Sequence, residues 1–257
     1  KIFFDNFGKK IKIVSLSEGL KKTNHIITAT SWKSNLEKKT IIIAKKNKIK
    51  VSTILDHWVN YKERFTLNNN LTLPDEIYTQ DNHAFSIAKK CFYNVKITKI
   101  PNYYLNSCLN ELKSYKVSRV NYFLYLSEPI KSHYKKGNTF EKKRDFNEYQ
   151  SLMFFLKNIN KISNNVQKIK IRLHPSDKQT KYNDIIKKFK HLPLEISKTK
   201  SLLKDINQSS KIFGCETMAM VIALMAKKKV FCTIPPHSKS KCSLPYKSIQ
   251  YLRSLIS

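Results

Sequence analysis

Short runs of β-branched and aromatic residues alternate along the chain with longer stretches of helical periodicity. The runs predict strands at residues 11–14, 25–30, 50–55, 76–79, 95–100, 119–126, 168–173, 194–196, 211–213 and 230–234. The periodic stretches predict helices at residues 34–46, 82–91, 104–114, 146–158, 181–189, 202–208 and 216–226. Such alternation indicates an α/β protein with parallel sheets.

The pattern restarts near residue 118, ahead of the long apolar run 119–126. We therefore expect two α/β domains, residues 1–118 and 119–257, with a cleft between them. Ligands of open parallel sheets bind at the carboxyl ends of the strands, so candidate chemistry is sought there.

The composition narrows the class of protein. The 257 residues carry 49 Lys and Arg against 18 Asp and Glu, a formal net charge of +31. Hydrophobic residues make up 41%, which is too much for a disordered basic tail. No apolar run reaches the length of a membrane-spanning helix, and the first residues do not resemble a secretory signal. The chain starts with Lys rather than Met, so we expect a fragment of a longer protein.

The basic excess is almost entirely lysine and is spread over both halves. Readers of base sequence and phosphate clamps favour arginine, so we expect no specific nucleic-acid partner. An anionic membrane surface is a further expected partner, and a composition without functional meaning remains open. The five scattered cysteines form no disulfide or zinc pattern, which indicates a cytoplasmic protein without a metal cofactor, peripheral on the inner face of a membrane if it binds lipid.

The segment from Ile169 to Asp177 delivers His174, Pro175 and Ser176 at the end of a predicted strand. A histidine at that place can hydrogen-bond a phosphate or protonate a leaving group. A structural histidine that bonds its own loop is the alternative interpretation.

A second segment, forty residues further on, passes from a strand into a helix through Gly214, Cys215, Glu216 and Thr217. Free N–H groups at a helix start suit a phosphate, and Glu216 could hold ribose hydroxyls. Plain capping of a buried helix is the alternative interpretation. Ser127 and Glu128, at the end of the run 119–126, could by position touch the base or ribose of the same nucleotide, and an ordinary connection is the alternative interpretation.

These two segments together resemble the nucleotide-binding half of GT-B glycosyltransferases, above all bacterial sialyltransferases and related transferases of CMP-activated nonulosonic acids or Kdo. The resemblance covers residues 119–240 and implies two Rossmann-like halves that face a cleft. It also implies a His-Pro motif and a helix start that hold the donor, although Gly214–Thr217 replaces the expected serine pair.

The first half offers a polar and aromatic segment directly after the strand 50–55. The resemblance implies a catalytic base there, for which Asp56 is the first candidate and Glu18, in an acidic-Gly pair, the second. Capping of the following segment is the alternative role for Asp56. The neighbouring residues expected to bind substrate are His57, Trp58, Tyr61 and Arg64.

The expected activity is metal-independent, inverting transfer of a sialic-acid-like sugar from a CMP donor to a surface glycan, as in lipopolysaccharide or capsule biosynthesis. Asp56 would be the base, and His174 would assist the departing phosphate. Three alternatives remain open: a GT-B enzyme with a UDP-sugar or CDP-polyol donor, a basic nucleic-acid-binding module, and an inactive carbohydrate- or lipid-binding domain.

Overall fold

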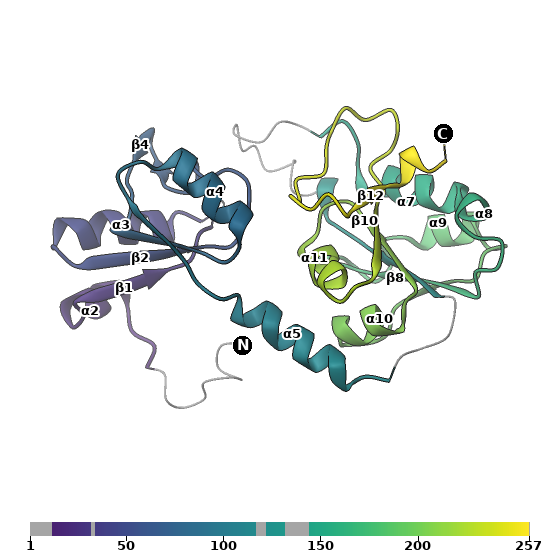
Figure 1. The fold of residues 1–257 in the computed structure, drawn as a ribbon, viewed down its shortest axis with the longest axis horizontal. Coiled ribbons are helices and arrows are strands. Elements are labelled where there is room, and N and C mark those ends of the chain that lie inside the picture. The colour runs from purple at the N-terminus through teal and green to yellow at the C-terminus, as the bar shows by residue number, and fades with distance from the viewer. Residues whose placement is uncertain (1–11, 32–33, 117–121, 132–143, 257) are drawn as a thin grey trace. The chain divides into compact units, whose positions relative to one another are not determined.

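The computed structural model describes residues 12–31, 34–116, 122–131 and 144–256. The chain divides into two compact units, Lys1–Asn102 and Tyr103–Ser257 (Figure 1). The sequence pattern predicts the boundary near residue 118, which lies outside the described residues. The difference is helix α5 (Tyr103–Ser114), which packs against helices α10 and α11 of the second unit.

Unit 1 contains a four-stranded parallel sheet in the order β1-β2-β5-β6. The elements are β1 (His25–Thr28), β2 (Lys50–Leu55), β5 (Glu76–Thr79), β6 (Lys96–Lys99), and the helices α2 (Leu16–Lys21), α3 (Leu36–Lys46) and α4 (Asn82–Cys91). Asp81 is the N-cap of α4, because its carboxylate accepts from the N–H of Ala84 at 2.8 Å. Since neighbouring strands of this sheet follow one another in sequence order, unit 1 is wound in one direction.

The start of unit 1 corrects one prediction. Residues 12–14 form no strand, and Ser15 instead caps helix α2 by accepting from the N–H of Glu18 at 3.2 Å. Glu18 and Gly19 are therefore helical, so the acidic-Gly turn at a strand end does not exist. Residue 11 lies outside the described residues.

A short hairpin of β3 (Thr66–Leu67) and β4 (Asn70–Leu71) is absent from the elements that the sequence predicts. Its two turn residues, Asn68 and Asn69, have φ values of 49° and 63°. Asparagine tolerates this left-handed backbone better than most residues, so the asparagine run was the available signal.

Unit 2 contains a six-stranded sheet whose neighbouring strands pair in parallel, in the order β12-β11-β10-β7-β8-β9. Its strands are β7 (Tyr122–Leu126), β8 (Lys168–Arg172), β9 (Leu194–Ile196), β10 (Lys211–Gly214), β11 (Lys229–Cys232) and β12 (Gln250–Tyr251). Its further helices are α7 (Glu148–Lys157), α8 (Ile159–Ile162), α9 (Asn183–Lys188), α10 (Leu202–Gln208), α11 (Met218–Met225) and the 3-10 turn η2 (Leu252–Ser254). Counted from β7, the order is 3-2-1-4-5-6, that of a doubly wound sheet.

The prediction of an α/β protein with parallel sheets is thereby confirmed, and the cleft between two Rossmann-like halves stays a prediction. The predicted strand 119–126 is seen as β7, with residues 119–121 outside the described part of the chain. All five residues of β7 are buried, as expected of a central parallel strand covered on both faces.

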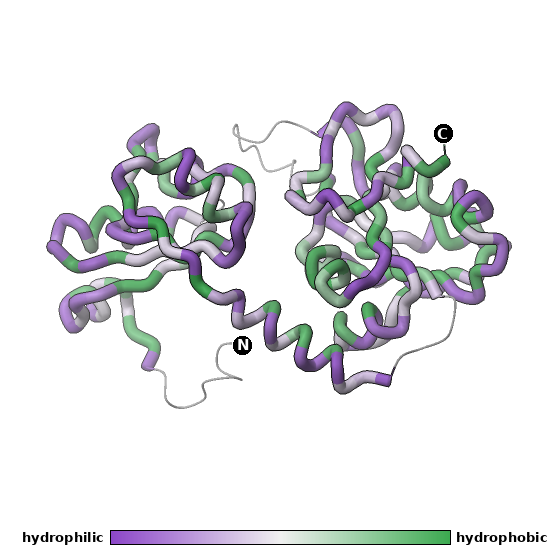
Figure 2. The backbone as a smooth tube through the Cα atoms, viewed as in Figure 1, coloured by the Kyte–Doolittle hydropathy of each residue, from purple (hydrophilic) through white to green (hydrophobic). Residues whose placement is uncertain are grey.

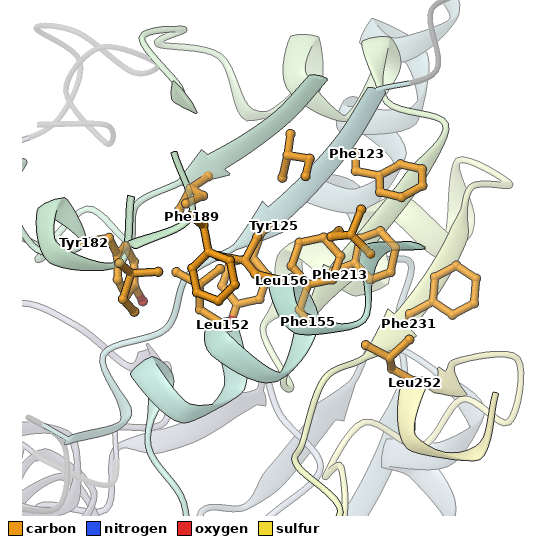
Figure 3. Close-up of a cluster of buried hydrophobic side chains, with 14 residues drawn as sticks. Phe123, Tyr125, Leu152, Phe155, Leu156, Tyr182, Phe189, Phe213, Phe231 and Leu252 are labelled. Atoms are coloured by element: carbon orange, nitrogen blue, oxygen red, sulfur yellow. The ribbon is translucent and has the colours of Figure 1, made fainter. Parts of the chain in front are cut away.

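Aromatic side chains dominate the core on one face of this sheet (Figure 3). The rings of Phe123 and Phe231 lie 5.2 Å and 5.1 Å from that of Phe213, and Phe155 of α7 approaches Phe213 at 4.3 Å. On the other face, α11 is apolar along its whole length and appears green in Figure 2. Its central residues, Met220 to Ala223, are buried, so α11 anchors the end of β10 in the protein interior.

Gly214 ends β10 at a point where the chain is tightly packed. A Cβ atom there would lie 3.0 Å from Met220 Sδ and 3.3 Å from the carbonyl oxygen of Leu126. A Cβ atom at this position would therefore require Met220 or the Leu126 backbone to shift by a few tenths of an ångström.

We expect Gly214→Ala to lower the free energy of unfolding by ~1–3 kcal/mol, the usual cost of overpacking. Gly19→Ala is the matched control, since its Cβ would meet only Val14 Cγ2 at an ordinary 3.5 Å. That control should stabilise helix α2 by ~0.5–1 kcal/mol. Urea denaturation measures both, and equal effects would contradict the tight packing at Gly214.

Candidate functional site

The candidate site lies at the carboxyl ends of β7, β8 and β10. The strand order reverses between β7 and β10, and doubly wound sheets bind ligands at this switch point. The predicted nucleotide-binding residues of unit 2 all follow these three strands, and β8 pairs directly with β7. The sequence prediction that they share one edge is therefore consistent with the topology.

His174 is held in a tight turn after β8. Its Nδ1 atom accepts from the backbone N–H of Ser176 at 3.2 Å and lies 2.7 Å from the Ser176 hydroxyl. Because a backbone N–H can only donate, the neutral imidazole carries its proton on Nε2. The turn thus presents the ring as a donor through Nε2, while Pro175 and Ser176 are exposed.

Asp177 joins this turn to the end of β7, a role that the sequence analysis missed. Its Oδ2 atom accepts from the backbone N–H of His174 at 3.1 Å and from the hydroxyl of Ser127 at 2.8 Å. Ser127 is buried and also lies 2.8 Å from the hydroxyl of Tyr182. Ser127 is therefore a structural link between two loops, not a group open to a nucleotide.

Lys181 neutralises this cluster from one turn further along the chain. Its ammonium lies 2.8 Å from Asp177 Oδ1 and 3.3 Å from Glu148 Oε1, with all three side chains nearly buried. It also donates to the carbonyl oxygen of Glu128 at 3.2 Å. Paired and hydrogen-bonded in this way, the charges hold the His174 turn and the β7 end in one arrangement.

The helix start at α11 is already occupied by a carboxylate of the protein itself. Glu128 Oε1 accepts from the N–H groups of Glu216 at 2.7 Å and Cys215 at 3.2 Å. Thr217 is the N-cap and accepts from the N–H of Ala219 at 3.4 Å. The expected phosphate seat is thus filled in this arrangement, because a carboxylate satisfies the helix dipole as a phosphate would.

The other side chains at this helix start have structural partners. Glu216 forms an ion pair with Arg144 and accepts from the N–H of Ser243 at 3.0 Å. Its carboxylate therefore holds the loop that contains Ser243, whereas the sequence analysis expected it to hold ribose hydroxyls. Cys215 is buried in the core with its Sγ atom 3.0 Å from the hydroxyl of Ser151. Burial raises the pKa of the Cys215 thiol well above its ordinary value, so it is no nucleophile.

In unit 1, Asp56 follows β2 as predicted, but it does not cap a helix. Its Oδ1 atom accepts from Thr30 at 3.0 Å and from the guanidinium of Arg64 at 3.2 Å. The Asp56 side chain is 58% exposed, whereas that of Arg64 is 4% exposed. Asp56 is therefore the counter-ion of a buried arginine and still presents its second oxygen at the surface.

Three of the four residues expected to bind substrate are structural. Arg64 also donates to the carbonyl oxygens of Thr30 and Val59, both at 3.0 Å, so its donors serve the fold. Tyr61 is buried and stacks on Phe92 in the core, and burial raises the pKa of its hydroxyl.

Trp58 is 8% exposed, and its indole N–H donates to Asp81 at 2.9 Å. His57 is partly exposed beside the Trp58 ring, and its Nδ1 accepts from the Trp58 N–H at 3.0 Å. Glu18, the second candidate base, lies on helix α2 and forms ion pairs with Lys12 and Lys22. Most of the polar and aromatic side chains of this segment therefore contribute to packing in unit 1.

Within the described residues, no group of three His, Cys, Asp or Glu side chains could hold a metal ion. The same part of the chain contains no helix that is both long enough and apolar enough to cross a membrane.

Comparisons with protein families and with curated proteins find no match. Among solved structures, the chain is similar to KpsC, a beta Kdo 2,7 transferase of Thermosulfurimonas dismutans. The sequences are 14% identical, the match covers 86% of each chain, and the TM-score is 0.34. At this TM-score the likeness assigns neither a fold nor an activity to the chain.

The raised pKa of the Glu128 carboxyl group predicts how the free energy of unfolding depends on pH. Burial raises the pKa of Glu128 to about 7 from an ordinary value of 4.5, against the lowering effect of the Glu216 N–H. The folded protein therefore binds this proton more tightly than the unfolded chain does. The contribution of the protonated Glu128 carboxyl group to the free energy of unfolding is complete below pH 4.5 and is lost as pH rises through about 7.

We expect the free energy of unfolding to fall by ~1–3 kcal/mol from about pH 5 to pH 8 because of this group. Glu128→Gln keeps the acceptor oxygen without the titration, so that part of the pH dependence should disappear. Urea denaturation across this pH range tests it, and an unchanged pH dependence in the variant would remove Glu128 as its source.

Proposed function

We propose that the protein is a glycosyltransferase that transfers a nonulosonic sugar from a CMP donor to a glycan hydroxyl. The observation that carries the proposal is the His174 turn, held by Asp177 against the end of β7 beside the switch point of a doubly wound sheet. The His-Pro resemblance described above supplies the donor class.

The proposed reaction divides its proton transfers between the two units. Asp56 takes the proton of the acceptor hydroxyl, whose oxygen forms a bond to the anomeric carbon of the donor. The bond between that carbon and the phosphate oxygen breaks, and CMP leaves with the electron pair. His174 Nε2–H donates to the departing phosphate oxygen and stabilises its charge.

The proposal assigns the phosphate to His174 first, because Glu128 fills the start of α11. A phosphate that moved onto this helix start would have to displace Glu128, whose pKa of about 7 makes protonation feasible near neutral pH. Gly214, Cys215, Glu216 and Thr217 then shape the helix start through their backbone, while the side chains of the last three keep structural partners.

We expect His174→Ala to weaken CMP binding and to lower turnover by ~10²–10⁴-fold, the usual contribution of general acid catalysis. Calorimetry with CMP, CDP and UDP measures the affinity and also separates the donor classes. Ser176→Ala is the matched control, since it removes a neighbour of the ring without removing the Nε2 donor. Unchanged CMP affinity and turnover in His174→Ala would contradict the assignment.

For Asp56, the test must separate a base from a counter-ion. Asp56→Asn weakens the ion pair with Arg64 and removes the base, whereas Arg64→Met removes the same pair and keeps the carboxylate. We expect Asp56→Asn to lower transfer by several orders of magnitude at nearly unchanged CMP affinity. Arg64→Met should lose stability, because Thr30 and Val59 lose their donor, yet retain transfer per folded molecule.

Equal residual transfer in the two variants, measured on the fraction that remains folded, would mean that Asp56 serves only the fold. Glu18→Gln completes the set and should leave transfer unchanged, since Glu18 lies on helix α2 rather than at a strand end.

A further inference from the structure

A second feature of unit 2 lies at the amino ends of the strands, opposite the carboxyl ends that carry the candidate site. There a hollow of about 600 Å³ opens beside the first residues of β10, β11 and β12. It is lined by four lysines, Lys211, Lys227, Lys228 and Lys229, together with polar and apolar side chains. We call it the basic hollow. Its volume is typical of a site for a small ligand.

The charge in the basic hollow is not balanced by the protein. No Asp or Glu lines it, and within the described residues none of its four lysines forms an ion pair. Elsewhere in unit 2 partly buried cations are paired, as Lys181 is with Asp177 and Arg172 with Asp205. An unbalanced cluster in a concave site attracts anions from solution.

Two of the lysines are anchored by backbone carbonyls. Lys228 Nζ donates to the carbonyl oxygens of Asn207 and Ser209, both at 2.8 Å, at the end of α10. Lys211 Nζ donates to the carbonyl oxygen of Ile162 at 3.1 Å. Burial, and to a smaller extent the nearby charge of Lys229, lower the pKa of Lys211 from its ordinary value.

Lys227 occupies a backbone conformation that disfavours a side chain. Its φ is 60°, in the turn that ends α11, where glycine is the usual residue. The run Lys227–Lys229 directly follows the apolar helix α11, and its hydrophilic colour contrasts with the green of that helix (Figure 2). This turn ends the helix and places Lys227 among the residues that line the hollow.

We propose that the basic hollow binds a phosphate group, carried either by the headgroup of an anionic lipid or by a free phosphorylated molecule. Lysine ammonium groups bind phosphate as point charges, and Ser248 and Gln250 of the lining add polar groups with hydrogen-bond donors. Met225 and Leu255 are 36% and 53% exposed among the lining residues and provide apolar contacts next to the charges. This site is independent of the proposed transfer reaction.

The test uses two probes, inorganic pyrophosphate and phosphatidylcholine vesicles with or without phosphatidylglycerol. We expect saturable binding of at least one phosphate source, and Lys227→Gln/Lys229→Gln should weaken it about tenfold. Lys187→Gln/Lys188→Gln, at the end of α9, removes the same charge outside the hollow and should bind as the parent protein does.

Lys227→Gly provides a variant that folds at least as well, since glycine suits the left-handed backbone at this position. It should also bind more weakly. Binding of phosphatidylglycerol vesicles alone identifies a lipid headgroup, binding of pyrophosphate alone identifies a soluble ligand, and binding of both identifies the phosphate itself. Equal weakening in the α9 control would show that net charge alone is responsible, and either that result or the absence of binding to both probes overturns the proposal.

Discussion

The arrangement of unit 2 depends on satisfying the polar groups at the end of one buried strand. β7 is covered on both faces, so the groups that follow it must find partners within the protein. Asp177, Lys181 and Glu148 supply them as a nearly buried set of charges around Ser127, and Glu128 turns toward the start of α11. Because those partners come from the loop after β8 and from helices α7 and α11, they fix the relative positions of three loops.

The arginines show how this lysine-rich chain uses its guanidinium groups. Each of the four described arginines, Arg64, Arg144, Arg172 and Arg253, donates to acceptors on two or more residues. The planar, multidentate donor set of arginine suits this role better than an ammonium does. In a chain so rich in lysine, the few arginine positions therefore indicate structural clamps rather than ligand contacts.

The periodicity of the sequence predicted most of the strands and helices, because buried parallel strands and amphipathic helices leave strong local patterns. It could not predict the partner of a polar side chain. Glu128 follows β7 as expected, yet the N–H groups it binds belong to residues almost ninety positions later, at 215 and 216. Asp56 was likewise placed at its strand end, while its contact with buried Arg64 depends on how the intervening turns fold.

The two sheets also differ in how far apart along the chain their paired strands lie. In unit 1 every strand pairs with the next strand of its sheet, whereas in unit 2 Phe123 of β7 pairs with Lys211 of β10. Closing so long a segment slows folding, and contacts between distant residues form late. During synthesis from the N-terminus, unit 1 can therefore fold from local contacts. The edge that carries the candidate site is assembled only after β10 and the start of α11 have joined β7.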